Sequence, residues 1–148
     1  MSLSIRIMDE MKNAMRAKDT IALEALRAIK SEILLAQTSA GATEITEADE
    51  IKILQKLVKM RKDSASIFTT QNRLDLAEPE LAQIAVIEKF LPAQLSDSEV
   101  EAIVSKIIAE TGASGIASMG KVMGLASSEI GGSAEGKTIS TIVKKLLV

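Results

Sequence analysis

The chain has 148 residues, of which 47% are apolar, so one or two domains with a sizeable aliphatic core are expected. It has no cysteine and no histidine, which excludes a disulfide framework, a thiol nucleophile, imidazole catalysis and most zinc sites. The net charge of −2 argues against a strongly cationic nucleic-acid-binding protein, although it does not exclude local basic patches. Two prolines and many strong helix formers predict an all-α fold.

The first two predicted helices cover residues 4–17 and about 20–39. Met8, Met11 and Met15 fall at helical spacing on the first helix, which predicts a core-facing stripe rather than an adaptable binding surface. Asp19 or Thr20 is the expected cap of the second helix. The core stripe of that helix is expected at Ala22, Leu26, Ile29 and Ile33.

The third helix is predicted from Thr46 to about Thr69, because Thr46 and Asp49 have the spacing of a capping box. One apolar side consists of Leu54, Leu57, Val58 and Phe68. A second apolar side consists of Ile53, Met60 and Ile67. A helix that is apolar on two sides is expected to lie between neighbouring helices. The remaining arc carries Lys52, Lys56, Lys59 and Lys62.

Later signals place four more helices and a domain boundary. Pro79 predicts the first turn of a fourth helix, which ends before Pro92 because proline disfavours helix in the preceding residue. Ser96 and Glu99 form a capping-box pattern that predicts a fifth helix, and two short helices follow over about 118–130 and 135–147. We therefore predict an N-terminal helical bundle domain over residues 1–92 and a small helical tail domain over residues 93–148.

Residues 131–138 read GGSAEGKT, which fits the phosphate-loop pattern G-x-x-x-x-G-K-[ST]. Such a loop needs a β-strand leading into it and a helix leading out. Residues 123–130 predict the end of a helix instead, so we do not predict nucleotide hydrolysis. We predict a glycine turn, with Lys137 in the first turn of the last helix, where a cation opposes the helix dipole. Lys137 is then either a solvated lysine or a contact for an external anion.

Five blocks carry a resemblance that covers essentially the whole chain. They are LRAIKSEI (26–33), KMRKDSASIF (59–68), RLDLAEPELAQIAVIEKFLPAQLSDSE (73–99), MGKVMG (119–124) and GSAEGK (132–137). Together they resemble the GatB/YqeY family, and specifically its small freestanding YqeY-like members. The resemblance implies an all-helical protein whose C-terminal part is similar to the tail domain of the B subunit of the glutamine-dependent aminoacyl-tRNA amidotransferase.

That tail domain helps to hold the tRNA body while other domains perform the chemistry, so the resemblance implies tRNA as a partner. It also links the family to carbon–nitrogen ligase activity, but the freestanding members lack the catalytic domains. In this chain the lysines could contact phosphates, and glycines permit close backbone approach. The predicted nucleic-acid-binding residues are Gly120, Lys121, Gly136, Lys137, Lys144 and Lys145. Ser133 stands where the family pattern usually has arginine, so weaker RNA binding is expected.

The alternative function is a protein-interaction module that docks on an aminoacyl-tRNA synthetase or amidotransferase complex, for which the lysine arc of the third helix is a candidate surface. Its simpler interpretation is a solvated helix face. The carboxylates single out no acid–base pair, so no catalytic residue, cofactor or metal site is predicted. No apolar run has the length of about 18 residues that a membrane span needs, and acids occur too early for a secretory signal. We therefore expect a cytoplasmic protein with no membrane partner.

Overall fold

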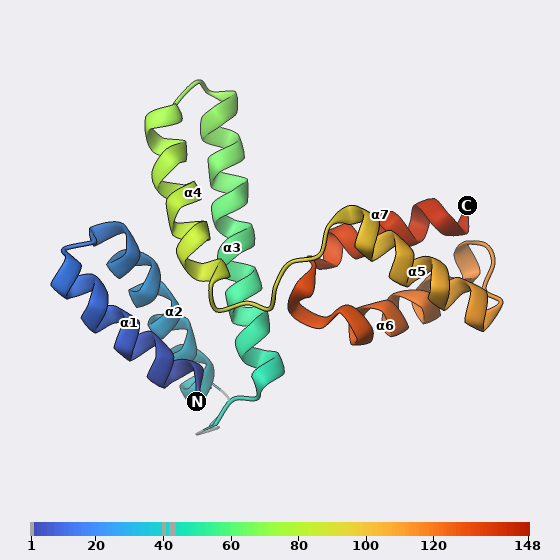
Figure 1. The fold of residues 1–148 in the computed structure, drawn as a ribbon, viewed down its shortest axis with the longest axis horizontal. Helices are drawn as coiled ribbons and strands as arrows, with labels where there is room; N and C mark the ends of the chain where they lie inside the picture. The colour runs from blue at the N-terminus through green and yellow to red at the C-terminus, as the bar shows by residue number, and fades with distance from the viewer. Residues whose placement is uncertain (1, 40, 42–43) are drawn as a thin grey trace. The chain divides into compact units, whose positions relative to one another are not determined.

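The computed structural model describes residues 2–39, 41 and 44–148, and over these residues the protein is all-α, as predicted. The described residues form seven α-helices and two short 3₁₀ turns, with no strand (Figure 1). The chain divides into two compact units, Met1–Leu91 and Pro92–Val148, each with its own cluster of buried residues. The boundary predicted after residue 92 lies next to this division.

The N-terminal unit contains four helices, and α2 is the central one. They are α1 (Leu3–Ala17), α2 (Thr20–Ser39), α3 (Glu47–Thr70) and α4 (Leu74–Glu88). Helices α3 and α4 form an antiparallel hairpin, and α2 packs against both of them as well as against α1 (Figure 1). The largest fully buried side chains of this unit are Ile7, Leu26, Ile29, Leu54 and Ile87, so the core is aliphatic.

The tail unit packs three helices around a core of branched aliphatic side chains. They are α5 (Asp97–Thr111), α6 (Met119–Ile130) and α7 (Gly136–Leu147), with the 3₁₀ turns η1 (Ile116–Ser118) and η2 (Gly131–Ser133) before α6 and α7. Its largest fully buried side chains are Val100, Val104, Val122, Ile139 and Val143. Of the described helices in either unit, none is long and apolar enough to cross a membrane.

Both predicted capping boxes are confirmed, and there is one in each unit. At the start of α3, the Asp49 N–H donates to the Thr46 hydroxyl at 3.1 Å, and the Thr46 N–H donates to the Asp49 carboxylate at 3.1 Å. At the start of α5, the Glu99 N–H donates to the Ser96 hydroxyl at 3.2 Å, and the Ser96 N–H donates back to the Glu99 carboxylate at 3.5 Å. These bonds satisfy N–H groups that a helix N-terminus otherwise leaves without partners.

The prediction that the methionine stripe of α1 faces the core was wrong for two of its three members. Met8 and Met15 are 50% and 53% exposed, and Met11 is half-buried. The buried side of α1 consists of Leu3, Ile7 and Ala14. Successive residues turn by about 100° around a helix, so Ile7 and Met8 point in different directions. Helix α1 has two neighbouring apolar stripes, and the stripe that contains the small residue Ala14 is the one buried in the core.

The second apolar side of α3 was also predicted wrongly as buried. Met60 and Ile67 are 53% and 57% exposed, and Ile53 is half-buried. On the predicted core side, Leu54, Leu57 and Val58 are buried as expected, and Phe68 is half-buried. Of the described helices, α2 and α4 are the ones that pack extensively on α3, which leaves Met60 and Ile67 exposed.

Helix α4 begins at Leu74, earlier than predicted, so Pro79 lies inside the helix rather than in its first turn. An ion pair spans the start of the helix, because Arg73 at the N-cap and Asp75 in the first turn approach to 3.0 Å. Ala77 is buried in the turn before the proline. Packing of this early turn therefore outweighs the backbone hydrogen bond that proline removes.

The two capping boxes provide a matched test of how independent the units are. Removing the capping hydroxyl in Thr46→Ala or Ser96→Ala is expected to destabilise the affected unit by about 1 kcal/mol, because a helix donor loses its partner. Amide hydrogen exchange should show the change in residues 2–91 for Thr46→Ala and in residues 92–148 for Ser96→Ala. Equal loss of protection in both units with either variant would contradict two separate cores.

Acid should weaken the start of α3 through Asp49. Hydrogen bonds from the Thr46 hydroxyl and the Thr46 N–H hold the pKa of Asp49 below its ordinary value of 3.8. Because the folded pKa is below the unfolded one, this contribution to stability is complete above the unfolded pKa and is lost as pH falls through the folded pKa. A carboxyl NMR titration of Thr46→Ala should show the Asp49 pKa moving up toward its ordinary value. An unchanged pKa would show that the bond from the Thr46 hydroxyl is not its main cause.

Candidate nucleic-acid interface

Helix α7 has two chemically distinct sides. Its buried residues are Ile139, Ile142, Val143 and Leu147, which pack against α5 and α6. Its exposed residues include Lys137, Thr141, Lys144 and Lys145. The helix contains no acidic residue. The solvent side of α7 is therefore basic, and we call Lys137, Lys144 and Lys145 the α7 lysine face.

Two of these three lysines have no competing carboxylate. The Nζ of Lys145 lies 3.7 Å from a carboxylate oxygen of Glu101 on α5, in an ion pair that is largely exposed. Within the part of the chain that the structure describes, Lys137 and Lys144 form no ion pair. They are seven residues apart, about two helical turns, and so lie on the same side of α7. Their ammonium groups can therefore meet two separate phosphates.

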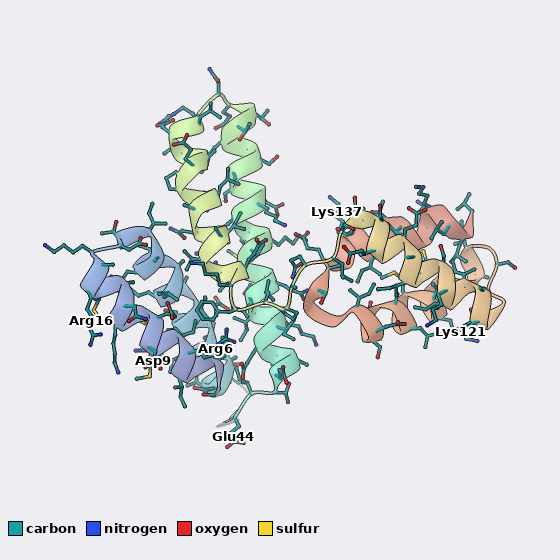
Figure 2. All side chains as sticks on the ribbon, in the orientation of Figure 1. Arg6, Asp9, Arg16, Glu44, Lys121 and Lys137 are labelled. Carbon is teal, nitrogen blue, oxygen red and sulfur yellow. The ribbon has the colours of Figure 1, made fainter. Side chains whose placement is uncertain are left out.

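The six predicted residues do not form one cluster. Figure 2 shows Lys121 and Lys137 at opposite ends of the tail unit. Gly120 and Lys121 lie in the first turn of α6, whereas Gly136 and Lys137 begin α7. The geometry thus separates an α7 group from a pair at the start of α6. The assignment of all six residues to nucleic-acid binding stays a prediction.

The segment GGSAEGKT is a turn between two helices, as expected from the residues before it. Helix α6 leads directly into it, so the strand that a phosphate-binding loop requires is replaced by a helix. Lys137 is the second residue of α7 and so lies in its first turn, as predicted, and Glu135 precedes the helix without a side-chain capping bond. Among the described residues, no group of three or more acidic side chains could hold a metal ion.

Gln94 and Leu95, which precede α5, hold this turn in place. Gly131 has φ 57° and ψ −129°, a combination that essentially only glycine adopts. The Gln94 side-chain amide donates to the Gly132 carbonyl at 2.9 Å, and the Leu95 N–H donates to the Ser133 carbonyl at 2.8 Å. Sequence reasoning missed Gln94, and its only signal was its place in the block of residues 73–99 that carries the family resemblance. Gln94 is a positioning residue, since it sets the turn from which α7 starts.

Three other glycines near the candidate site have no steric reason to be glycine. A Cβ atom added at Gly120, Gly124 or Gly136 would meet no other atom within 4 Å. None of the three has a positive φ angle. Glycine inside a helix costs roughly 0.5–1 kcal/mol relative to alanine. Packing of the tail unit does not offset this cost.

The lysine arc of α3, which was the candidate surface for a protein partner, is partly neutralised. Lys56 lies 3.4 Å from a Glu32 carboxylate oxygen, and Lys62 lies 4.0 Å from one of Glu88. Arg61 beside the arc donates to the Gln83 side-chain oxygen at 2.9 Å. These contacts favour the solvated-face interpretation of the arc.

Residues 4–147 match the model of the family described as Yqey-like protein. The chain belongs to the YqeY-like family. A relative from Pyrenophora tritici-repentis, named "Altered inheritance of mitochondria protein 41, mitochondrial", is 34% identical over 132 residues, covering 87% of this chain and 71% of the relative. Proteins of the same name from Lachancea thermotolerans and Clavispora lusitaniae are 34% and 37% identical, covering 68% and 62% of this chain. The matches span 55% and 54% of those two relatives, so about half of their length.

The names of these relatives overturn one prediction. All three are named mitochondrial proteins, so the predicted cytoplasmic location was wrong by this comparison. The prediction relied on the lack of a membrane span and of a secretory signal. Those features separate aqueous compartments from membranes and from the secretory route, but they do not distinguish one aqueous compartment from another.

The open glycines of α6 predict a gain in stability. We expect Gly120→Ala and Gly124→Ala each to raise the unfolding free energy of the tail unit by roughly 0.5–1 kcal/mol, because alanine is the better helix former and meets no obstacle. Gly131→Ala should lower it by about 1–3 kcal/mol through backbone strain. Chemical denaturation of the three variants measures both effects, and destabilisation by all three would show that the helix makes unseen use of Gly120 and Gly124.

Proposed function

We propose that this YqeY-like protein is an accessory protein related to the amidotransferase B subunit, and that it binds tRNA through its tail unit without an active site of its own. The observation that carries the proposal is the α7 lysine face, on a helix without any acid. The resemblance of the tail segment to the B-subunit tail domain supports tRNA as the nucleic acid. The proposal concerns backbone recognition and holds in any aqueous compartment.

Charge segregation supports phosphate binding by a unit that is nearly neutral. Residues 91–148 carry five basic and six acidic side chains. The acids lie outside α7, and three of them, Asp97, Glu99 and Glu101, lie in the first part of α5. Neutralising a phosphate releases condensed counterions, and this gain depends on the lysines that reach the backbone rather than on net charge. The α7 lysine face can therefore bind RNA although the chain is slightly acidic.

The composition of the tail unit favours recognition of RNA shape over recognition of bases. Both aromatic residues of the chain, Phe68 and Phe90, lie in the N-terminal unit. Single-stranded bases are usually held by stacking on aromatic side chains, which the tail unit lacks. Folded RNA is recognised largely by its shape and through its phosphates and 2′-hydroxyl groups. A structured RNA such as tRNA fits this surface better than a single strand.

The perturbed carboxylates support a protein without its own acid–base chemistry. The pKa of Asp49 is lowered by its capping bonds with Thr46, and the pKa of Asp75 is lowered chiefly by its hydrogen bonds from Arg73. Both groups are exposed on helix starts. Catalytic carboxylates typically owe their shifts to a pocket and a specific partner within it. These shifts have local, structural causes instead.

A second candidate function is docking on a synthetase or amidotransferase complex. The observation in its favour is a set of large apolar side chains exposed on the α3–α4 hairpin, whose far end extends beyond α1 and α2 (Figure 1). These residues are Met60, Ile67, Leu74, Leu76 and Leu81. Partners that the full chain retains after ribonuclease treatment would favour this alternative over RNA binding.

Neutralising the two unpaired lysines of α7 tests the tRNA proposal. We expect Lys137→Gln combined with Lys144→Gln to weaken tRNA binding about tenfold and to reduce the slope of log affinity against log salt by about one for each lysine. The matched control is Lys52→Gln combined with Lys59→Gln, which removes the same charge from α3. Binding is measured by fluorescence anisotropy across a salt series. No binding at low salt, a flat salt response, or equal losses in both double variants would refute the proposal.

A further inference from the structure

A groove of about 440 Å³ crosses the N-terminal unit between α1, the start of α2 and the end of α4. Its volume is in the range of small-molecule sites, about 300–1,000 Å³. Side chains that recur every three or four residues line its α1 wall, from Arg6 to Ala17. Figure 2 labels Arg6 and Asp9 of this wall. The opposite wall is formed by Val86, Lys89 and Phe90. The groove lies entirely within the N-terminal unit.

Small residues keep the groove open, and its floor is apolar. Ala14, Ala17 and Ala22 all contribute to its lining, and the buried Leu26 lies beneath them. A larger side chain at any of the three alanine positions would occupy part of the space. An apolar floor with a few polar groups at the edges is the usual composition of a small-molecule site.

Charges of both signs line the groove without pairing across it. Arg6 and Lys89 are cationic, and Asp9, Glu10 and Asp19 are anionic. Asp9 pairs with Lys12 at 3.9 Å, but among the described residues none of the other four side chains has an ion pair within 4.0 Å. Arg6 and Glu10 are four residues apart, a spacing at which an ion pair readily forms on a helix surface. Complementary charges therefore remain available at the edges of an apolar groove.

The cation at one end is held in place by an aromatic ring. The Arg6 guanidinium carbon lies 5.0 Å from the centroid of the Phe90 ring, within the range of a cation–π contact. This contact orients the guanidinium, which can then bind a carboxylate through two parallel hydrogen bonds. At the other end, one oxygen of Asp19 accepts the Ala22 N–H at 3.0 Å, which fixes that carboxylate at the start of α2.

We propose that this groove binds a small zwitterion with an apolar side chain, of the α-amino-acid or short-peptide type. Its carboxylate would meet Arg6 and Lys89, its ammonium would meet Glu10, and its side chain would cover the alanines, while Asp19 would serve the ammonium of a longer peptide. Arg6 and Glu10 are about 6 Å apart along α1, and Arg6 and Ala17 about 16 Å, at ~1.5 Å per residue. The shorter separation suits a single amino acid, and the longer one leaves room for a peptide. The inference does not depend on RNA binding, because the groove belongs to the other unit.

NMR titration of the full chain tests this site with four probes: leucine, leucyl-leucine, N-acetylleucine, which lacks the ammonium, and leucinamide, which lacks the carboxylate. We expect leucine or leucyl-leucine, at millimolar concentration, to shift the backbone amides of Ala14, Ala17 and Ala22. N-acetylleucine and leucinamide should each bind about tenfold more weakly, since each loses a charge-assisted hydrogen bond. Tighter binding of leucyl-leucine assigns the site to peptides, and tighter binding of leucine assigns it to amino acids.

Two kinds of variant separate the groove from the rest of the surface. Ala17→Phe should fill the groove and weaken binding at least about tenfold, whereas Ala85→Phe, the same change at an exposed position of α4 outside the groove, should bind like the wild type. Glu10→Gln changes no volume and should weaken binding of the ammonium-bearing probes, so it remains informative if Ala17→Phe does not fold. The proposal is overturned if neither zwitterion shifts these amides, if N-acetylleucine binds as well as leucine, or if Ala17→Phe and Ala85→Phe behave alike.

Discussion

The turn at Gly131 is the backbone constraint on which the surface of the tail unit depends. Its left-handed conformation ends α6, and the bonds from Gln94 and Leu95 then hold the two following carbonyls. Once the start of α7 is set, burial of Ile139 and Val143 determines the rotation of the helix. Lys137 and Lys144 must then face solvent, because residues seven apart share one side of a helix. The Gly131 conformation and the burial of the α7 core residues together determine where the positive charge of α7 is displayed.

Features that depend on neighbouring residues could be predicted from the sequence. The capping boxes Thr46–Asp49 and Ser96–Glu99, the all-α class and the helical lead into GGSAEGKT all rest on contacts within a few residues. The place of Lys137 in the first turn of α7 followed from the same local reasoning. Local hydrogen bonding and glycine conformation decide such features largely without help from the rest of the fold.

Features that depend on which helix packs against which could not be predicted in this way. The methionine pattern of α1 was compatible with burial, but the core instead took the side that contains Ile7 and Ala14. The groove was missed for the same reason, because its lining residues belong to two segments that are far apart in the sequence, 6–26 and 86–90. Arg6 and Phe90 meet only after α1 and α4 have both packed around α2. No spacing rule connects residues that are so far apart in the chain.

Both units are nearly neutral, but they distribute their charged side chains differently. Each carries nearly equal numbers of acids and bases, so neither can attract a charged partner from a distance through net charge. The tail unit places lysines on a helix without acids, whereas the N-terminal unit keeps opposite charges apart along an apolar groove. At most about three phosphates can be neutralised by the α7 lysine face, which bounds the electrostatic part of its affinity. Recognition by either surface must therefore rely on close fit, for which backbone geometry and small side chains matter as much as charge.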